Sequence, residues 1–140
     1  MRILGLDIGD KRIGVAISDE LGITAQGVDI INRNGMKKDI DKILNMLEKY
    51  KVRRVVVGLP KNMNGTVGPQ VKSVKNFIEK IRLQTDVEFV YWDERLTTIA
   101  AEKILIDADL SRKKRKGVVD KLAAVIILQN YLDYKSRVDT

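Results

Sequence analysis

The opening stretch ILGLDIGDKRIGVAIS, residues 3–18, constrains the fold most strongly. Two apolar runs, at 2–8 and 12–18, flank the short polar segment GDKR, a pattern that predicts two antiparallel strands joined by a tight turn. Asp7 lies inside the first strand, between Leu6 and Ile8. An ionised carboxylate in such a place is costly unless a partner compensates its charge. The first strand therefore predicts both the start of a sheet and a carboxylate that needs a partner.

The rest of the chain alternates strand and helix patterns. We expect a third strand at 24–32, helices at 35–50, 71–81, 97–108 and 118–134, strands at 52–60 and 87–92, a Gly- and Asn-rich loop at 61–70, and a polar, basic connector at 109–117. An antiparallel meander followed by strand–helix units predicts an α/β fold. Its mixed five-stranded sheet, antiparallel over the first three strands, would carry helices on both faces. A length of 140 residues suits a single domain over 1–140.

The chain contains neither cysteine nor histidine, which narrows the chemistry available to it. Disulfides, thiolate or imidazole metal sites, and Ser-His-Asp or Cys-His catalysis are all excluded. Any bound metal must be a hard ion held by oxygen, most naturally Mg²⁺ or Mn²⁺.

The charge balance points to a polyanionic partner. The formal net charge is +7, whereas aromatic residues make up only 5%, so phosphate contacts are expected rather than base stacking. A basic protein with a merely solvated surface is an equally good interpretation of charge alone. The sequence also lacks an apolar stretch of about 20 residues and the pattern of a signal peptide, so we expect a cytoplasmic protein with no membrane partner.

Acidic residues occur at the ends of three predicted elements. Asp7 is on the first strand, Asp93 and Glu94 directly follow the 87–92 strand, and Asp120 is expected in the first turn of the last helix. In an α/β sheet, strand ends and helix starts converge, so these carboxylates could meet and share divalent cations. Each also has a structural interpretation. Asp120 suits a helix N-terminus, Glu94 could pair with Arg95, and a buried Lys or Arg could neutralise Asp7.

Two other segments suit phosphate binding. The stretch VVVGLPKNMNGTVGPQ, residues 55–70, runs from a strand through a Gly-rich loop into a helix, although it lacks the Walker A pattern and could be an ordinary connection. The stretch SRKKRKG, residues 111–117, holds five consecutive basic residues just before Asp120. Like charges in a row favour a solvated, disordered segment, and such a segment can also grip phosphates and order on binding.

Taken together, the motifs resemble the YqgF family, whose members are described as pre-16S rRNA nucleases and as Holliday junction resolvases. The resemblance rests on four segments in order: GLDIGDKRIGVAISD at 5–19, VVGLPKNMNGTVGPQ at 56–70, DERLTT at 93–98 and KKRKGVVDKLAAVIILQNYL at 113–132. It covers nearly the whole chain and implies an RNase H-like fold.

The resemblance also implies a catalytic acid in each of three motifs, which fall on Asp7, Glu94 and Asp120. These acids would hold two Mg²⁺ or Mn²⁺ ions for phosphodiester hydrolysis, with Asp93 as an auxiliary or substitute ligand. The implied substrate is the 5′ end of precursor 16S rRNA. Nucleic-acid contacts are expected from Lys11, Arg12, Asn62, Asn64, Gly65, Thr66, Arg95, Arg112, Lys113, Lys114, Arg115 and Lys116.

Three alternatives remain open at this stage. The same chemistry could resolve four-way DNA junctions, for which a homodimer would be needed, whereas structured RNA suits a monomer or a homodimer. A nucleic-acid-binding factor without nuclease activity, for example in transcription, would also explain the basic segment. The D-x-G of Asp7-Ile8-Gly9 is shared with sugar kinases and actin-like ATPases, but those proteins need two such domains.

Overall fold

A five-stranded mixed sheet forms the centre of the computed structural model, which describes residues 2–59, 68–93 and 112–139. The strands are β1 (Arg2–Ile8), β2 (Arg12–Ser18), β3 (Ala25–Asn32), β4 (Val52–Leu59) and β5 (Glu88–Asp93). Their order across the sheet is β3-β2-β1-β4-β5. β1, β2 and β3 pair antiparallel, and β4 and β5 run parallel to β1. The predicted mixed sheet is therefore confirmed.

Connection length explains this topology. Short connections, residues 9–11 and 19–24, join the first three strands and allow antiparallel pairing, whereas parallel strands need long crossovers. Helix α1 (Met36–Lys49) links β3 to β4, and helix α2 (Pro69–Arg82) lies between β4 and β5 in the chain. As a result, the carboxyl ends of β1, β4 and β5 share one edge of the sheet.

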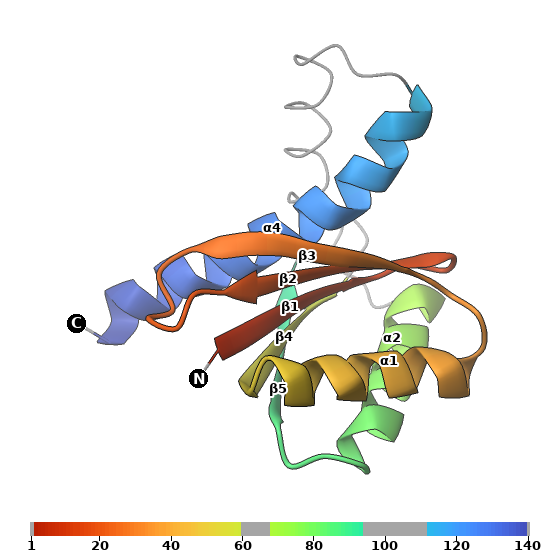
Figure 1. The fold of residues 1–140 in the computed structure, drawn as a ribbon, viewed down its shortest axis with the longest axis horizontal. Coiled ribbons are helices and arrows are strands. Elements are labelled where there is room, and N and C mark those ends of the chain that lie inside the picture. The colour runs from red at the N-terminus through yellow and green to blue at the C-terminus, as the bar shows by residue number, and fades with distance from the viewer. Residues whose placement is uncertain (1, 60–67, 94–111, 140) are drawn as a thin grey trace.

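The helices cover both faces of the sheet, as expected. Figure 1 shows α1 and α2 on one face and α4 (Arg112–Asp139) across the other. Strand alternation divides β1 between two cores. Leu4, Leu6 and Ile8 belong to the core under α1 and α2. Ile3 belongs to the core under α4, with Leu128 among its members.

The structure corrects the boundaries predicted near the helix starts. The expected connector 109–117 is wrong from residue 112 onward, because α4 begins at Arg112 and includes the basic run. Lys and Arg are good helix formers, so like charge alone does not prevent helix formation when the apolar part of the same helix is packed on a sheet. Asp120 consequently lies more than two turns into α4 rather than in its first turn.

Smaller differences concern α2 and the strands. The expected loop 61–70 ends before α2 begins at Pro69, a residue favoured at a first helical position. The strand predicted at 24–32 begins at Ala25, and β5 is shifted by one residue to Glu88–Asp93. The last residue of the strand predicted at 52–60 lies outside the described residues. The helix expected at 97–108 lies outside the described residues. No helix among the parts of the chain that the structure describes is long and apolar enough to cross a membrane.

Gly5 sets how closely α4 approaches the sheet. A Cβ atom at Gly5 would lie 2.8 Å from the Leu128 Cβ and 3.2 Å from the Ala124 carbonyl oxygen. Gly5→Ala must therefore displace the helix, and we expect it to lower the free energy of unfolding by about 1–3 kcal/mol. Urea denaturation measures this change. The matched control is Gly27→Ala, whose Cβ would have its three nearest contacts with the flexible Lys121 side chain. An equal decrease in both variants would contradict the helix-displacement explanation.

Tyr91 offers a second test of the core. Its hydroxyl is buried and has no hydrogen-bond partner among the described residues, and burial, with Glu79 contributing, raises the pKa of Tyr91. Tyr91→Phe removes this unsatisfied group, so we expect unfolding free energy at neutral pH to stay constant or rise by up to about 1 kcal/mol. The folded state favours the neutral phenol of Tyr91, so the free energy of unfolding of the wild type decreases as the pH rises above about 10. Tyr91→Phe has no phenol to ionise, so its free energy of unfolding should lack the part of this decrease that Tyr91 contributes.

The control for this variant is Tyr131→Phe. The Tyr131 hydroxyl accepts a hydrogen bond of 2.7 Å from the Arg54 guanidinium, so its removal should cost about 1.5–3 kcal/mol. Thermal and urea denaturation of both variants check the contrast, and a comparable decrease for Tyr91→Phe would show that its hydroxyl does have a stabilising partner.

Candidate active site

Asp7 lies near the carboxyl end of β1 and is half-buried. Side chains alternate along a strand, so Asp7 shares a face with Ile3 and Gly5, which is the face covered by α4. Its antiparallel partner on β2 is Gly14, which has no side chain. The carboxylate therefore lies on the α4 side of the sheet, beside a position where the neighbouring strand contributes only backbone.

The contacts between α4 and β1 are described as far as Ala124, four residues after Asp120. Ile3 and Leu132 belong to one core and line the same small cavity, and Gly5 packs against Ala124 and Leu128. Two further strand residues advance about 6.6 Å to Asp7, and one helical turn back from Ala124 advances about 6 Å to Asp120. Asp120 therefore lies about 6 Å further along the helix axis from this contact, and its side chain lies outside the described part of the structure.

Asp93 ends β5 at the same edge of the sheet, where it pairs with Leu59 of β4. Trp92 packs against Tyr131 of α4, with ring centroids 5.7 Å apart. By alternation, Asp93 belongs to the opposite face from Asp7, which does not favour it as a substitute ligand. Glu94 and Arg95 lie outside the described residues.

The expected nucleic-acid contacts are only partly described. Lys11 is exposed in the β1–β2 turn, and the half-buried Arg12 begins β2. Both residues therefore lie beside the carboxyl end of β1, near Asp7. Asn62, Asn64, Gly65 and Thr66 lie outside the described residues. For Arg112, Lys113, Lys114, Arg115 and Lys116 the structure describes only the helical backbone.

The donor chemistry of the site fits a hard divalent cation. Among the described side chains no group of three acidic residues is placed to hold a metal ion, but the side chains of Glu94 and Asp120 are not part of that set. A chain without His or Cys can offer only oxygen ligands, and carboxylate oxygens are the ligands that Mg²⁺ and Mn²⁺ prefer. Asp7 offers such oxygens near the carboxyl end of β1, on the face of the sheet that α4 covers.

Sequence reasoning did not single out the residues that hold the turn after Asp7. The Arg33 side chain donates a hydrogen bond of 3.0 Å to the Gly9 carbonyl and lies 3.2 Å from the buried carboxylate of Asp39. Both residues occur in the polar stretch NRNGMKKD, residues 32–39, which has the composition of an ordinary solvated connection. Only the folded chain brings this stretch to the β1–β2 turn.

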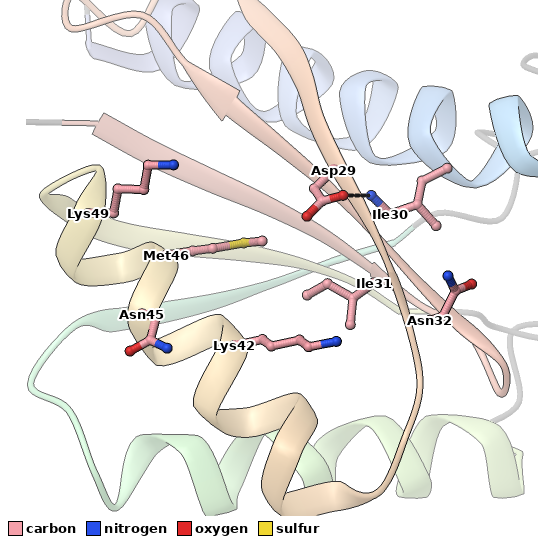
Figure 2. Close-up of a pocket in the computed structure, with 8 residues that line it drawn as sticks. All are labelled: Asp29, Ile30, Ile31, Asn32, Lys42, Asn45, Met46 and Lys49. Carbon is pink, nitrogen blue, oxygen red and sulfur yellow. Dashed lines mark hydrogen bonds between the residues drawn. The ribbon is translucent and has the colours of Figure 1, made fainter.

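A separate groove of about 410 Å³ lies between edge strand β3 and helix α1 (Figure 2). Figure 2 shows Lys42 and Ile31 on its opposite walls. The residues that line it are Asp29, Ile30, Ile31, Asn32, Lys42, Asn45, Met46 and Lys49. Asp7 is not among them, and β2 separates β3 from β1, so this groove is distinct from the carboxylate site.

Structural comparison defines the class of the protein as RNase H-like. The fold matches T. thermophilus RuvC in complex with a Holliday junction substrate with a TM-score of 0.62 at 12% identity, covering 97% of this chain and 96% of that chain. It matches the fowlpox virus Holliday junction resolvase with a TM-score of 0.59 at 17% identity, covering 96% and 99%. At such identities the likeness is one of fold, and it confirms the expected RNase H-like architecture.

Sequence comparison then gives the family. The profile of RuvX, described as a Holliday junction resolvase family, matches residues 1–134. A relative from Carboxydothermus hydrogenoformans is 54% identical over 98% of this chain and 99% of its own length. One from Clostridioides difficile is 57% identical over 96% and 95%. Both carry the name "Putative pre-16S rRNA nuclease". The chain therefore belongs to the RuvX family, which is the YqgF family under another name. This confirms the resemblance that was inferred from the sequence motifs.

Proposed function

We propose that this chain is a metal-dependent nuclease that hydrolyses phosphodiester bonds at the 5′ end of precursor 16S rRNA during ribosome maturation in the cytoplasm. The observation that carries the proposal is the close packing of α4, the helix that contains Asp120, on the face of β1 to which Asp7 belongs. The names of relatives that match nearly the full chain support the choice of substrate.

In this proposal Asp7, Glu94 and Asp120 would hold two Mg²⁺ or Mn²⁺ ions. Such ions activate water and stabilise the leaving oxygen at a phosphodiester. Three carboxylates close together repel one another, so the site is expected to bind cations before it binds a phosphate. Lys11 and Arg12 would hold the nucleic-acid backbone beside Asp7, and the exposed position of Lys11 suits that role.

The other basic candidates would extend the same contact surface. Arg95 and the run from Arg112 to Lys116 would bind further phosphates. Asn62, Asn64, Gly65 and Thr66 would position the strand that is cut. These roles are proposals from the sequence motifs.

Resolution of four-way DNA junctions is the second candidate, because both structural matches and the family description name Holliday junction resolvases. Symmetric cleavage of a junction needs two sites in one assembly, so this candidate requires a homodimer. Mass measured against protein concentration tests that requirement, and a strict monomer favours the rRNA substrate.

The central experiment compares wild type with Asp7→Asn, which removes one charge at nearly constant volume. We expect Asp7→Asn to fold normally and to cleave about 100-fold or more slowly with Mn²⁺ or Mg²⁺, an effect at least as large as removal of an outer-shell group from a metal site. The substrates are a labelled 5′ fragment of precursor 16S rRNA, a four-way DNA junction and a plain duplex. The substrate that the wild type cuts decides between processing of precursor 16S rRNA and resolution of four-way DNA junctions.

The matched control is Asp41→Asn, the same chemical change at an exposed position on α1, across the sheet from α4. It should cleave like wild type, and chelation should abolish cleavage in both proteins. Equal cleavage by wild type and Asp7→Asn, or no cleavage by either, would contradict the nuclease mechanism. Undiminished binding after chelation would then favour a non-catalytic binding factor.

Lys11 provides a separate test of substrate contact. We expect Lys11→Ala to reduce the salt dependence of RNA binding, because one phosphate fewer is neutralised. The slope of log K against log salt concentration should fall in magnitude by about 0.7–0.9. Binding is measured in the Asp7→Asn background to prevent cleavage. Lys42→Ala in the α1–β3 groove is the control, and an equal change there would show only a general effect of net charge.

A further inference from the structure

The turn between β1 and β2 is held by Arg33, the residue that follows β3. The Arg33 backbone N–H donates to the Lys11 carbonyl at 2.9 Å, and its guanidinium donates to the Gly9 carbonyl at 3.0 Å. The turn itself is closed by the Gly9 N–H, which donates to the Arg12 carbonyl at 2.8 Å. Arg33 thus binds both sides of the turn that begins two residues after Asp7.

Two further contacts, with Asp39 and with Phe77, hold the Arg33 side chain. Its Nε donates to Oδ2 of Asp39 at 3.2 Å, and its guanidinium lies 4.9 Å from the centroid of the Phe77 ring. Asp39 is only 1% exposed, and its other oxygen accepts the Asn34 backbone N–H at 2.9 Å. The guanidinium therefore has one defined orientation, with a further donor directed at the turn.

Stability alone does not require an ion pair between Arg33 and Asp39 at this position. Burying a carboxylate with a guanidinium costs desolvation energy, and apolar residues of similar volume often stabilise a protein as well or better. What a planar guanidinium adds is a fixed fork of donors, which can connect the buried carboxylate to a backbone carbonyl at a set distance. The carbonyl that it reaches belongs to Gly9, where an added Cβ would lie only 2.9 Å from the Arg12 carbonyl oxygen.

We propose that Arg33 is a positioning residue, oriented by Asp39, that fixes the backbone from Asp7 to Arg12 and so the carboxylate of Asp7. The effect on metal binding rests on the proposed function, whereas the effect on the turn does not. A cation site needs its ligands within a few tenths of an ångström, so a loosened turn should weaken cation binding even though Arg33 lies on the opposite face of the sheet from α4.

The test uses Arg33→Lys, which keeps the positive charge beside Asp39 but removes the planar fork. We expect Mn²⁺ binding, measured by titration calorimetry, to weaken roughly 10- to 100-fold, the range seen when an outer-shell group is removed. We also expect faster amide hydrogen exchange at Gly9, measured by NMR.

Arg54→Lys is the matched control. Arg54 likewise contacts a carboxylate and a second oxygen, with distances of 2.9 Å to Glu88 and 2.7 Å to Tyr131. The Arg33 and Arg54 side chains are similarly exposed, at 20% and 19%. Arg54 lies near the amino end of β4, at the other end of the sheet from the turn. Its replacement should change stability without altering Mn²⁺ affinity or Gly9 exchange.

A double variant distinguishes the loss of the Arg33 contact with the turn from a general loss of stability. Arg33→Met with Asp39→Leu removes both charges, so no unpaired buried charge remains and the domain should stay folded. It should still show weakened Mn²⁺ binding and fast Gly9 exchange, because no guanidinium donor reaches the Gly9 carbonyl.

The outcomes distinguish the two proposals. Wild-type Mn²⁺ affinity and unchanged Gly9 exchange in both Arg33 variants would overturn the positioning role. Absence of Mn²⁺ binding to the wild type would overturn the proposed function alone. In that case Gly9 exchange decides the positioning role, since faster exchange in both variants supports it and unchanged exchange overturns it.

Discussion

The close approach of α4 to β1 at Gly5 is the contact on which the candidate site depends. A glycine there lets the Leu128 and Ala124 region of the helix lie almost on the strand backbone. Asp7 lies two residues further along the same face of β1. Without that approach, the helix that contains Asp120 would stand further from the face of β1 to which Asp7 belongs.

The two faces of the sheet are packed differently. On the α1 and α2 face, the large apolar side chains of β1, β2 and β4 form the main core, which fixes the strands. On the α4 face the strands present smaller groups such as Gly5 and Ala16, so the helix can lie close. The connection from β3 to α1 joins the two faces, because Arg33 on the side of Phe77 holds the turn that follows Asp7. The two faces are thus linked through the backbone that follows Asp7.

The RNase H-like fold is shared with resolvases at only 12% to 17% identity, so the fold alone does not choose a substrate. The distinction between structured RNA and branched DNA must come from residues around the carboxylates and from the number of sites in one assembly. Lys11 and Arg12 are the described basic residues at the end of the sheet where Asp7 lies, and phosphate contacts of such side chains carry no sequence information.

Sequence by itself determined the local pattern of this protein. Apolar alternation and the GDKR turn were sufficient for the β1–β2 hairpin, helical spacing was sufficient for α1, and the absence of His and Cys restricted the ligands to oxygen. These are short-range properties, which residues express through their own conformational preferences. The start of α4 was predicted wrongly because a charged run is stabilised as helix by the packed segment that follows it, as at Ala124 and Leu128. Only the tertiary structure decided that Arg33 and Asp39 meet the Gly9 turn, and that Asp93 lies on the other face from Asp7. Contacts between distant segments depend on the register of packed elements, and no local pattern encodes that register.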